Sequence, residues 1–185
     1  MSSDPNKPDP TQFVLDTKRM WEEIAQGLHA WALVEEELFE LFCLAISPCP
    51  KNISAAVFHA SVTFDSKRKM TDSAIRTLLS GDPLLDEWIK PTGNGGLCER
   101  LRKKSMKRNT LAHGMVMETA EKGKPGTRKM VVCPPFSHAN IEHLDYSSKQ
   151  MDLTQLKDTV RSFWDMMERM RTFRRACEAS PRIRP

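Results

Sequence analysis

Apolar residues recur at steps of three and four along most of the chain, which is the period of a helix with one buried face. After Pro10 they are Trp21, Ile24, Leu28, Trp31, Leu38, Phe42 and Ala45. This pattern predicts one long helix, bent at Gly27. We expect it to end before Ser47-Pro48-Cys49-Pro50, because prolines cannot continue a helix.

A second helical pattern runs from about Ser54 to Leu79, and Gly81 follows it as a stop signal. Its apolar line consists of Phe58, Val62, Ile75 and Leu79. The dipeptide Asp82-Pro83 then predicts the start of a short helix through Trp88 and Ile89, since an N-cap residue followed by proline is typical of a helix start.

The third long pattern is a basic helix from Leu97 to His113, followed by Gly114, where a left-handed C-cap glycine is expected. Residues 115–119 and 128–132 flank a turn rich in glycine and proline, which predicts a β-hairpin. A loop is expected from Pro134 to Gln150. Asp152 and Gln155 have the spacing of a capping box, and a last helix should run from there to about Cys177.

These elements predict an all-α fold, a helical bundle with a small hairpin insertion at about 115–133. We expect one domain over 11–178, a disordered lead at 1–10 and a basic tail at 179–185. No stretch of eighteen apolar residues is present, so no membrane association is expected. The five cysteines are odd in number and scattered, a usage typical of a reducing compartment, which favours a cytoplasmic location.

Charge is distributed unevenly along the chain. The net charge is only +4, but residues 11–46 hold seven acidic and two basic residues, and residues 97–131 hold ten basic and three acidic ones. The basic segment is therefore a candidate surface for phosphate groups. The alternative is a solvated helix face that pairs with the acidic first helix.

Arg108 interrupts the predicted buried face of the basic helix. Steps of four and three from Leu97 lead through Leu101 and Ser105 to Arg108. An arginine there needs a carboxylate or a phosphate partner, because an unpaired buried charge is costly. Glu35 interrupts the apolar seam of the first helix in the same way. We therefore expect a buried ion pair between Glu35 and Arg108.

Asn109 and His113 are four residues apart and share the face next to that of Arg108. The last turn of a helix favours a cationic side chain. An imidazole beside an arginine suits a bound or transferring phosphate better than a metal ion, and no metal site or cofactor is expected. Taken alone, a histidine at the end of a helix is more often a residue that caps the helix, and this is the alternative for His113.

The segment Arg108-Asn109-Thr110-Leu111-Ala112-His113 resembles the signature of the HEPN superfamily: an arginine, a polar residue that is often asparagine, three further positions and a histidine. The surrounding helical pattern over roughly 20–175 looks like one bacterial group of these proteins. The resemblance implies a helical bundle that dimerises and brings two motifs together. It also implies, for many members, metal-independent RNase activity, and for others an inactive partner or a nucleotide-binding module.

On this resemblance we expect a homodimeric endoribonuclease with a toxin or defence role. Arg108, Asn109 and His113 would be catalytic, Glu35 would support Arg108, and Lys104 and Lys107 would hold the RNA backbone. An antitoxin or a nucleotidyltransferase is the expected kind of protein partner. The alternative is a non-catalytic HEPN-like dimer that binds a nucleotide, RNA or a partner protein.

Two further groups of residues are weaker candidates. Cys133, His138 and His143 could supply three zinc ligands, but the fourth is missing and the spacing is not a standard one. Asp65, Arg68 and Asp72 share one face of the second predicted helix. We expect them to form surface or interhelical ion pairs, with support of the site as the alternative.

Overall fold

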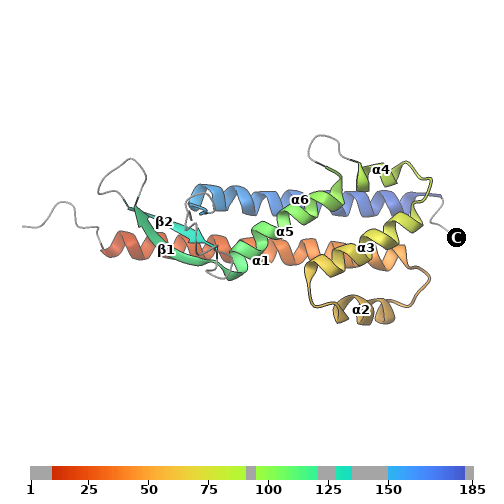
Figure 1. Cartoon of the computed structure of the whole chain (residues 1–185), viewed down its shortest axis with the longest axis horizontal. Helices are drawn as coiled ribbons and strands as arrows, with labels where there is room; N and C mark the ends of the chain where they lie inside the picture. The colour runs from red at the N-terminus through yellow and green to blue at the C-terminus, as the bar shows by residue number, and fades with distance from the viewer. Residues whose placement is uncertain (1–9, 91–94, 121–127, 135–149, 182–185) are drawn as a thin grey trace, which may run out of the picture. The chain divides into compact units, whose positions relative to one another are not determined.

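The computed structural model describes residues 10–90, 95–120, 128–134 and 150–181. Within these ranges the chain is mostly helical and contains one two-stranded antiparallel sheet (Figure 1). The elements are α1 (Pro10–Ala45), α2 (Lys51–Ala60), α3 (Phe64–Leu78), α4 (Leu84–Ile89), α5 (Leu97–His113), β1 (Met115–Ala120), β2 (Arg128–Cys133) and α6 (Leu153–Ala179). The predicted all-α class with a hairpin is confirmed.

Most helix ends agree with the signals in the sequence. The capping box is formed, since Gln155 N donates to Asp152 Oδ1 and Asp152 N donates to Gln155 Oε1, both at 3.0 Å. Gly81 has a φ of 76°, as expected for a glycine that ends a helix. Among the described residues, no helix has the length and apolar character needed to cross a membrane. Of the predicted lead at 1–10, loop at 134–150 and tail at 179–185, residues 1–9, 135–149 and 182–185 lie outside the described residues, while Pro10 begins α1 and Ala179 ends α6.

The second predicted helix is wrong in one respect, because the structure has two helices there. α2 ends at Ala60 and α3 begins at Phe64. Thr63 is extended, and its side chain accepts a hydrogen bond from Ser66 N at 3.2 Å. This cap starts a new helix, so Val62, which was expected in the core, is 95% exposed.

The chain divides into two compact units, and α1, α5 and α6 each contribute to both. The hairpin unit takes in the described residues of 1–29 and 107–161. The helical unit takes in those of 30–106 and 162–185.

Aromatic side chains and paired charges hold the helical unit together. Trp31 of α1 lies edge-on to Phe64 and Phe163, with ring centroids 4.7 and 5.1 Å apart. The buried carboxylate of Glu37 accepts hydrogen bonds from the Nε atoms of Arg171 and Arg174 of α6, each at 2.9 Å. A buried carboxylate is stable only with such partners, so this pair of bonds ties α6 to α1 within the unit.

The hairpin unit is built around the paired strands and the first half of α1. β1 and β2 run antiparallel, in a register that pairs Met115 with Cys133 at one end of the hairpin. Gly27 was predicted to mark a bend, and the structure gives it a packing role. A Cβ atom at Gly27 would lie 2.8 Å from Leu111 Cδ1, so a larger residue here would require the Leu111 side chain to shift.

Candidate functional site

The predicted motif occupies the last two turns of α5, within the hairpin unit. Leu111 is buried and anchors this end of the helix against α1. Asn109 and His113 are exposed, while Arg108 is half-buried. The helix therefore presents the amide and the imidazole to solvent and keeps the stem of the arginine against the protein.

Gly114 joins the motif helix to β1, and its predicted left-handed conformation is wrong. Among the described glycines, only Gly81 and Gly95 have a positive φ. A Cβ atom at Gly114 would lie 2.3 Å from Thr110 O and 2.7 Å from Cys133 O. The glycine is needed because the end of α5 and the end of β2 approach each other here, which fixes His113 beside the hairpin.

Arg108 has few partners for a half-buried arginine. Its Nη1 donates to Asn109 Oδ1 over 3.3 Å, at the long end for a hydrogen bond. Its Nε is buried and has no hydrogen-bond partner among the described residues. Arg102, two turns earlier, is different, because its Nε and Nη2 donate to Glu99 at 2.8 and 2.7 Å. A guanidinium without a carboxylate retains its capacity to bind another anion.

Glu35 is not observed as the partner of Arg108. Its Oε1 lies 2.5 Å from Lys67 Nζ of α3, within the helical unit. Arg108 takes part in no ion pair among the described residues. The step count selected Glu35 for the buried seam, but Glu35 is half-buried and the buried glutamate of α1 is Glu37. A helix face also has more than one neighbour. In the structure α3 supplies the cation.

The two predicted RNA-binding lysines fall in different units. Lys107 is exposed and belongs to the hairpin unit with the motif, whereas Lys104 is half-buried and belongs to the helical unit. The structure therefore brings Lys107, Arg108, Asn109 and His113 together on one segment of α5. It does not place Glu35 with them.

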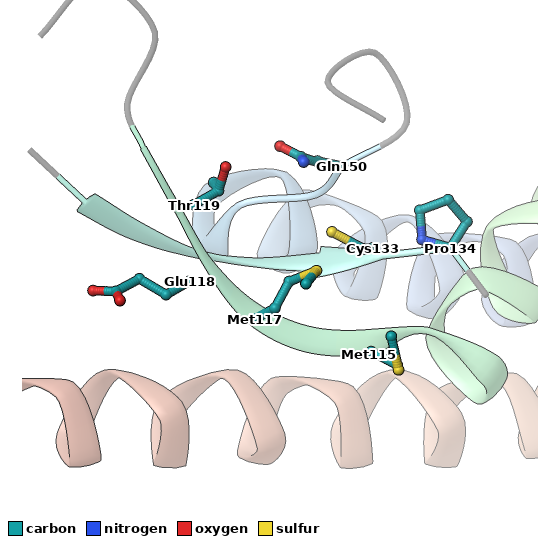
Figure 2. Close-up of a pocket in the computed structure, with 7 residues that line it drawn as sticks. All are labelled: Met115, Met117, Glu118, Thr119, Cys133, Pro134 and Gln150. Carbon is teal, nitrogen blue, oxygen red and sulfur yellow. The ribbon is translucent and has the colours of Figure 1, made fainter. Parts of the chain in front are cut away.

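A pocket of about 200 Å³ opens on the hairpin unit, and the sequence analysis did not identify it (Figure 2). The pocket is lined by four residues of β1, by the last residue of β2 and the proline after it, and by Gln150. These residues are Met115, Met117, Glu118, Thr119, Cys133, Pro134 and Gln150. In the sequence, the pocket could have been indicated by the two-residue period of a strand, which places Met115, Met117 and Thr119 on the same face of β1. Burial raises the pKa of the Cys133 thiol, while a hydrogen bond with the Gln150 side chain acts in the opposite direction.

The weaker candidates have separate outcomes. Arg68 donates to Asp65 Oδ1 from Nε and Nη2, at 3.2 and 2.7 Å, and Asp72 Oδ1 accepts from Trp88 Nε1 at 2.8 Å. The contact of Arg68 with Asp65 is an ion pair, and Asp72 forms a second one with Arg76 Nε at 2.9 Å, so ion pairs within the helical unit are confirmed. His138 and His143 lie outside the described residues. Within the described ranges, no three His, Cys, Asp or Glu side chains are grouped so that they could hold a metal ion.

No protein-family model, curated protein or solved structure matches this chain. The function of the site must therefore be inferred from the chemistry of its own residues. Within the hairpin unit these are one unneutralised guanidinium, one exposed imidazole and one amide, all within two turns of helix.

Proposed function

We propose that the protein is a HEPN-like, metal-independent endoribonuclease whose active site is formed by Arg108, Asn109 and His113. The observation that carries this proposal is the state of Arg108. Its Nε is buried without a partner, and no described carboxylate pairs with it. An arginine in this state, one turn from an exposed histidine, is suited to a phosphodiester.

In the proposed reaction, the 2′-hydroxyl of RNA attacks the adjacent phosphorus. The O2′–P bond forms and the P–O5′ bond breaks, which leaves a 2′,3′-cyclic phosphate and a 5′-hydroxyl. His113 accepts the proton of the attacking hydroxyl or donates a proton to the leaving oxygen. Arg108 donates hydrogen bonds to the phosphoryl oxygens, where negative charge increases in the transition state.

Asn109 and Lys107 have supporting roles in this proposal. Asn109 Oδ1 already accepts a hydrogen bond from Arg108 Nη1, so the amide limits the directions in which the guanidinium can point. Lys107 is exposed on the adjacent position of α5 and would hold the RNA backbone without reading its sequence. Lys104 belongs to the other unit, and its contact with RNA stays a prediction from the sequence.

A single histidine supplies one proton transfer, and complete cleavage requires both a base and an acid. We therefore propose that the protein acts as a homodimer in which the partner copy supplies the second His113. This proposal follows from the resemblance to HEPN proteins and from the presence of one histidine in the motif. A toxin or defence role, with an antitoxin or a nucleotidyltransferase as partner, belongs to the same proposal.

The decisive experiment is incubation of the purified protein with mixed RNA in EDTA. Cleavage should persist and leave 2′,3′-cyclic phosphate ends, because a guanidinium and an imidazole supply the chemistry. The variant His113→Ala should lose roughly 10²–10⁴-fold in rate, the usual contribution of a general acid or base. His59→Ala is the matched control, since His59 is exposed on α2 in the helical unit.

Two results would overturn the proposal in different ways. Cleavage by His113→Ala at the wild-type rate would remove His113 from the mechanism. Salt-sensitive binding of RNA without cleavage would instead favour the non-catalytic module, in which the same Arg108 binds a phosphate that does not react. Size-exclusion chromatography with light scattering tests the dimer separately from activity.

A further inference from the structure

We infer that the pocket of the hairpin unit is a subsite for one unpaired nucleobase, with adenine preferred. The inference rests on the proposed function, because it assigns to this pocket the base next to the phosphate held by Arg108. It adds base selectivity to a site whose motif residues, as proposed, touch only phosphate and sugar.

The size and the walls of the pocket suit a single flat ring. Its volume of about 200 Å³ is below the roughly 300–1,000 Å³ of pockets for drug-sized ligands, so it accepts one base while the attached sugar and phosphate stay outside. Met115 and Met117 line it and are 40% and 39% exposed, which leaves both thioethers accessible to a ligand. Methionine sulfur packs favourably against aromatic rings, and Pro134 adds a second apolar surface.

The polar groups of the pocket are suited to the edge of a base. Gln150 offers an amide with both a donor and an acceptor, and Thr119 offers a hydroxyl. Both side chains stand on the same side of the hairpin in Figure 2. A glutamine amide pairs with adenine through two hydrogen bonds, which is the reason for the expected preference.

The position of the pocket connects it to the motif. β1 begins at Met115, two residues after His113, and Met115 pairs with Cys133 on β2. The close approach of Gly114 to Thr110 O and Cys133 O holds the wall of the pocket against the last turn of α5. Phosphate at Arg108 and a base among the methionines would therefore belong to one bound strand.

The test uses RNA that cannot be cleaved, so it does not depend on catalysis. Labelled 2′-O-methyl tetranucleotides that differ in a single base are titrated against the full-length protein, and affinity is read by fluorescence anisotropy. The adenine oligonucleotide should bind best, by about tenfold, which is the size of discrimination typical of one bidentate pair between an amide side chain and a base. Gln150→Leu and Met117→Trp should both abolish the preference, the first by removing the amide and the second by filling the pocket.

Val14→Trp is the matched control, because Val14 is exposed on α1 in the same unit and outside the pocket. It should retain the preference, and thermal melting of each variant verifies folding. The inference is overturned if the wild type binds all four oligonucleotides alike, or if both pocket variants keep the preference. Free AMP is titrated in parallel, and binding as tight as that of the oligonucleotide would identify a mononucleotide as the source of the base.

Failure of this inference and failure of the proposed function are distinguishable. Cleavage of RNA without any base preference would retain the endoribonuclease and reject the subsite. If the wild type does not cleave RNA but still prefers one base, and His113→Ala keeps that preference, the subsite is retained and catalysis is rejected.

Discussion

Arg68 in the helical unit and Arg108 in the hairpin unit are both arginines whose side chains are partly or fully withdrawn from solvent. Three nitrogens of Arg68 are used: Nε and Nη2 donate to Asp65, and Nη1 lies 3.1 Å from Cys98 Sγ. Arg108 has one long bond to Asn109 and a buried Nε without a described partner. The same residue type thus stabilises the fold in one unit and remains available to an anion in the other.

This difference separates arginines used in ion pairs from one that is in none, in a chain with 28 basic residues. Ion pairs also account for Arg102, Arg171 and Arg174, each bonded to a glutamate. Its ion pairs also stabilise the charged form of Asp65, since hydrogen bonds from Lys69 and Arg68 lower the pKa of its carboxyl. Arg108 departs from this pattern, and it is the arginine of the predicted motif.

The largest expected effect tests Arg108 directly. Arg108→Ala should reduce RNA cleavage by about 10²–10³-fold, as does loss of one donor to a developing oxyanion. Arg102→Ala, on the same helix, removes an arginine that is already paired with Glu99 and should change the rate less than about twofold. Single-turnover rates on one labelled RNA measure both. Equal losses in the two variants would erase the functional distinction between the two arginines.

For stability the order should be reversed: replacing Arg68 should destabilise the protein more than replacing Arg108. Arg68→Ala should lower the free energy of unfolding by about 1–2 kcal/mol, because it removes a buried side chain with three bonding nitrogens, while its partner Asp65 stays half exposed. Arg108→Ala should cost about 0.5 kcal/mol or less, since the alanine leaves no described carboxylate without its partner. Urea unfolding monitored by circular dichroism gives both values. A larger loss at Arg108 than at Arg68 would indicate that Arg108 is structural.

The corrected partner of Glu35 predicts a smaller effect. Glu35→Ala should cost about 1 kcal/mol, because Lys67 is mostly buried and would lose its carboxylate. The neighbouring Glu36 is exposed, so Glu36→Ala should lower the free energy of unfolding by about 0.5 kcal/mol or less. A double-mutant cycle should find coupling between Glu35 and Lys67. Coupling between Glu35 and Arg108 would instead restore the pair expected from the sequence.

The smallest effect concerns the closed core of the helical unit, in contrast to the pocket of the hairpin unit. Burial raises the pKa of the fully buried Cys177 thiol from 9.0 to about 12. Below pH 9 the thiol is neutral in both states. Above it, only the unfolded chain releases the proton, so rising pH favours unfolding until the folded thiol also ionises. This contribution should amount to about 1 kcal/mol between pH 9 and 10.

Cys177→Ala removes that contribution, so its unfolding free energy should decline less steeply than that of the wild type over the same pH range. The comparison of the two slopes cancels the other groups that titrate there. Identical slopes would mean that the folded protein does not keep the Cys177 thiol from ionising.

Local signals in the sequence were sufficient for most of the secondary structure. Steps of three and four, the proline pair after Ala45 and the Asp152–Gln155 capping box depend on neighbours within a few residues, and they predicted α1, α5, the hairpin and α6. The break at Thr63 was also local, since a threonine three residues before a serine can cap a helix. It was missed because the apolar positions continue across it.

The sequence by itself determined the residues of the candidate site and their place at the end of α5, because a helix fixes which of its own residues are neighbours. Only the tertiary structure decided their partners. Lys67 pairs with Glu35, Gly114 meets Cys133, and the pocket combines both strands with Gln150. These contacts join residues 17 to 35 positions apart along the chain, and the periodicity of one element carries no information about which other element packs against it.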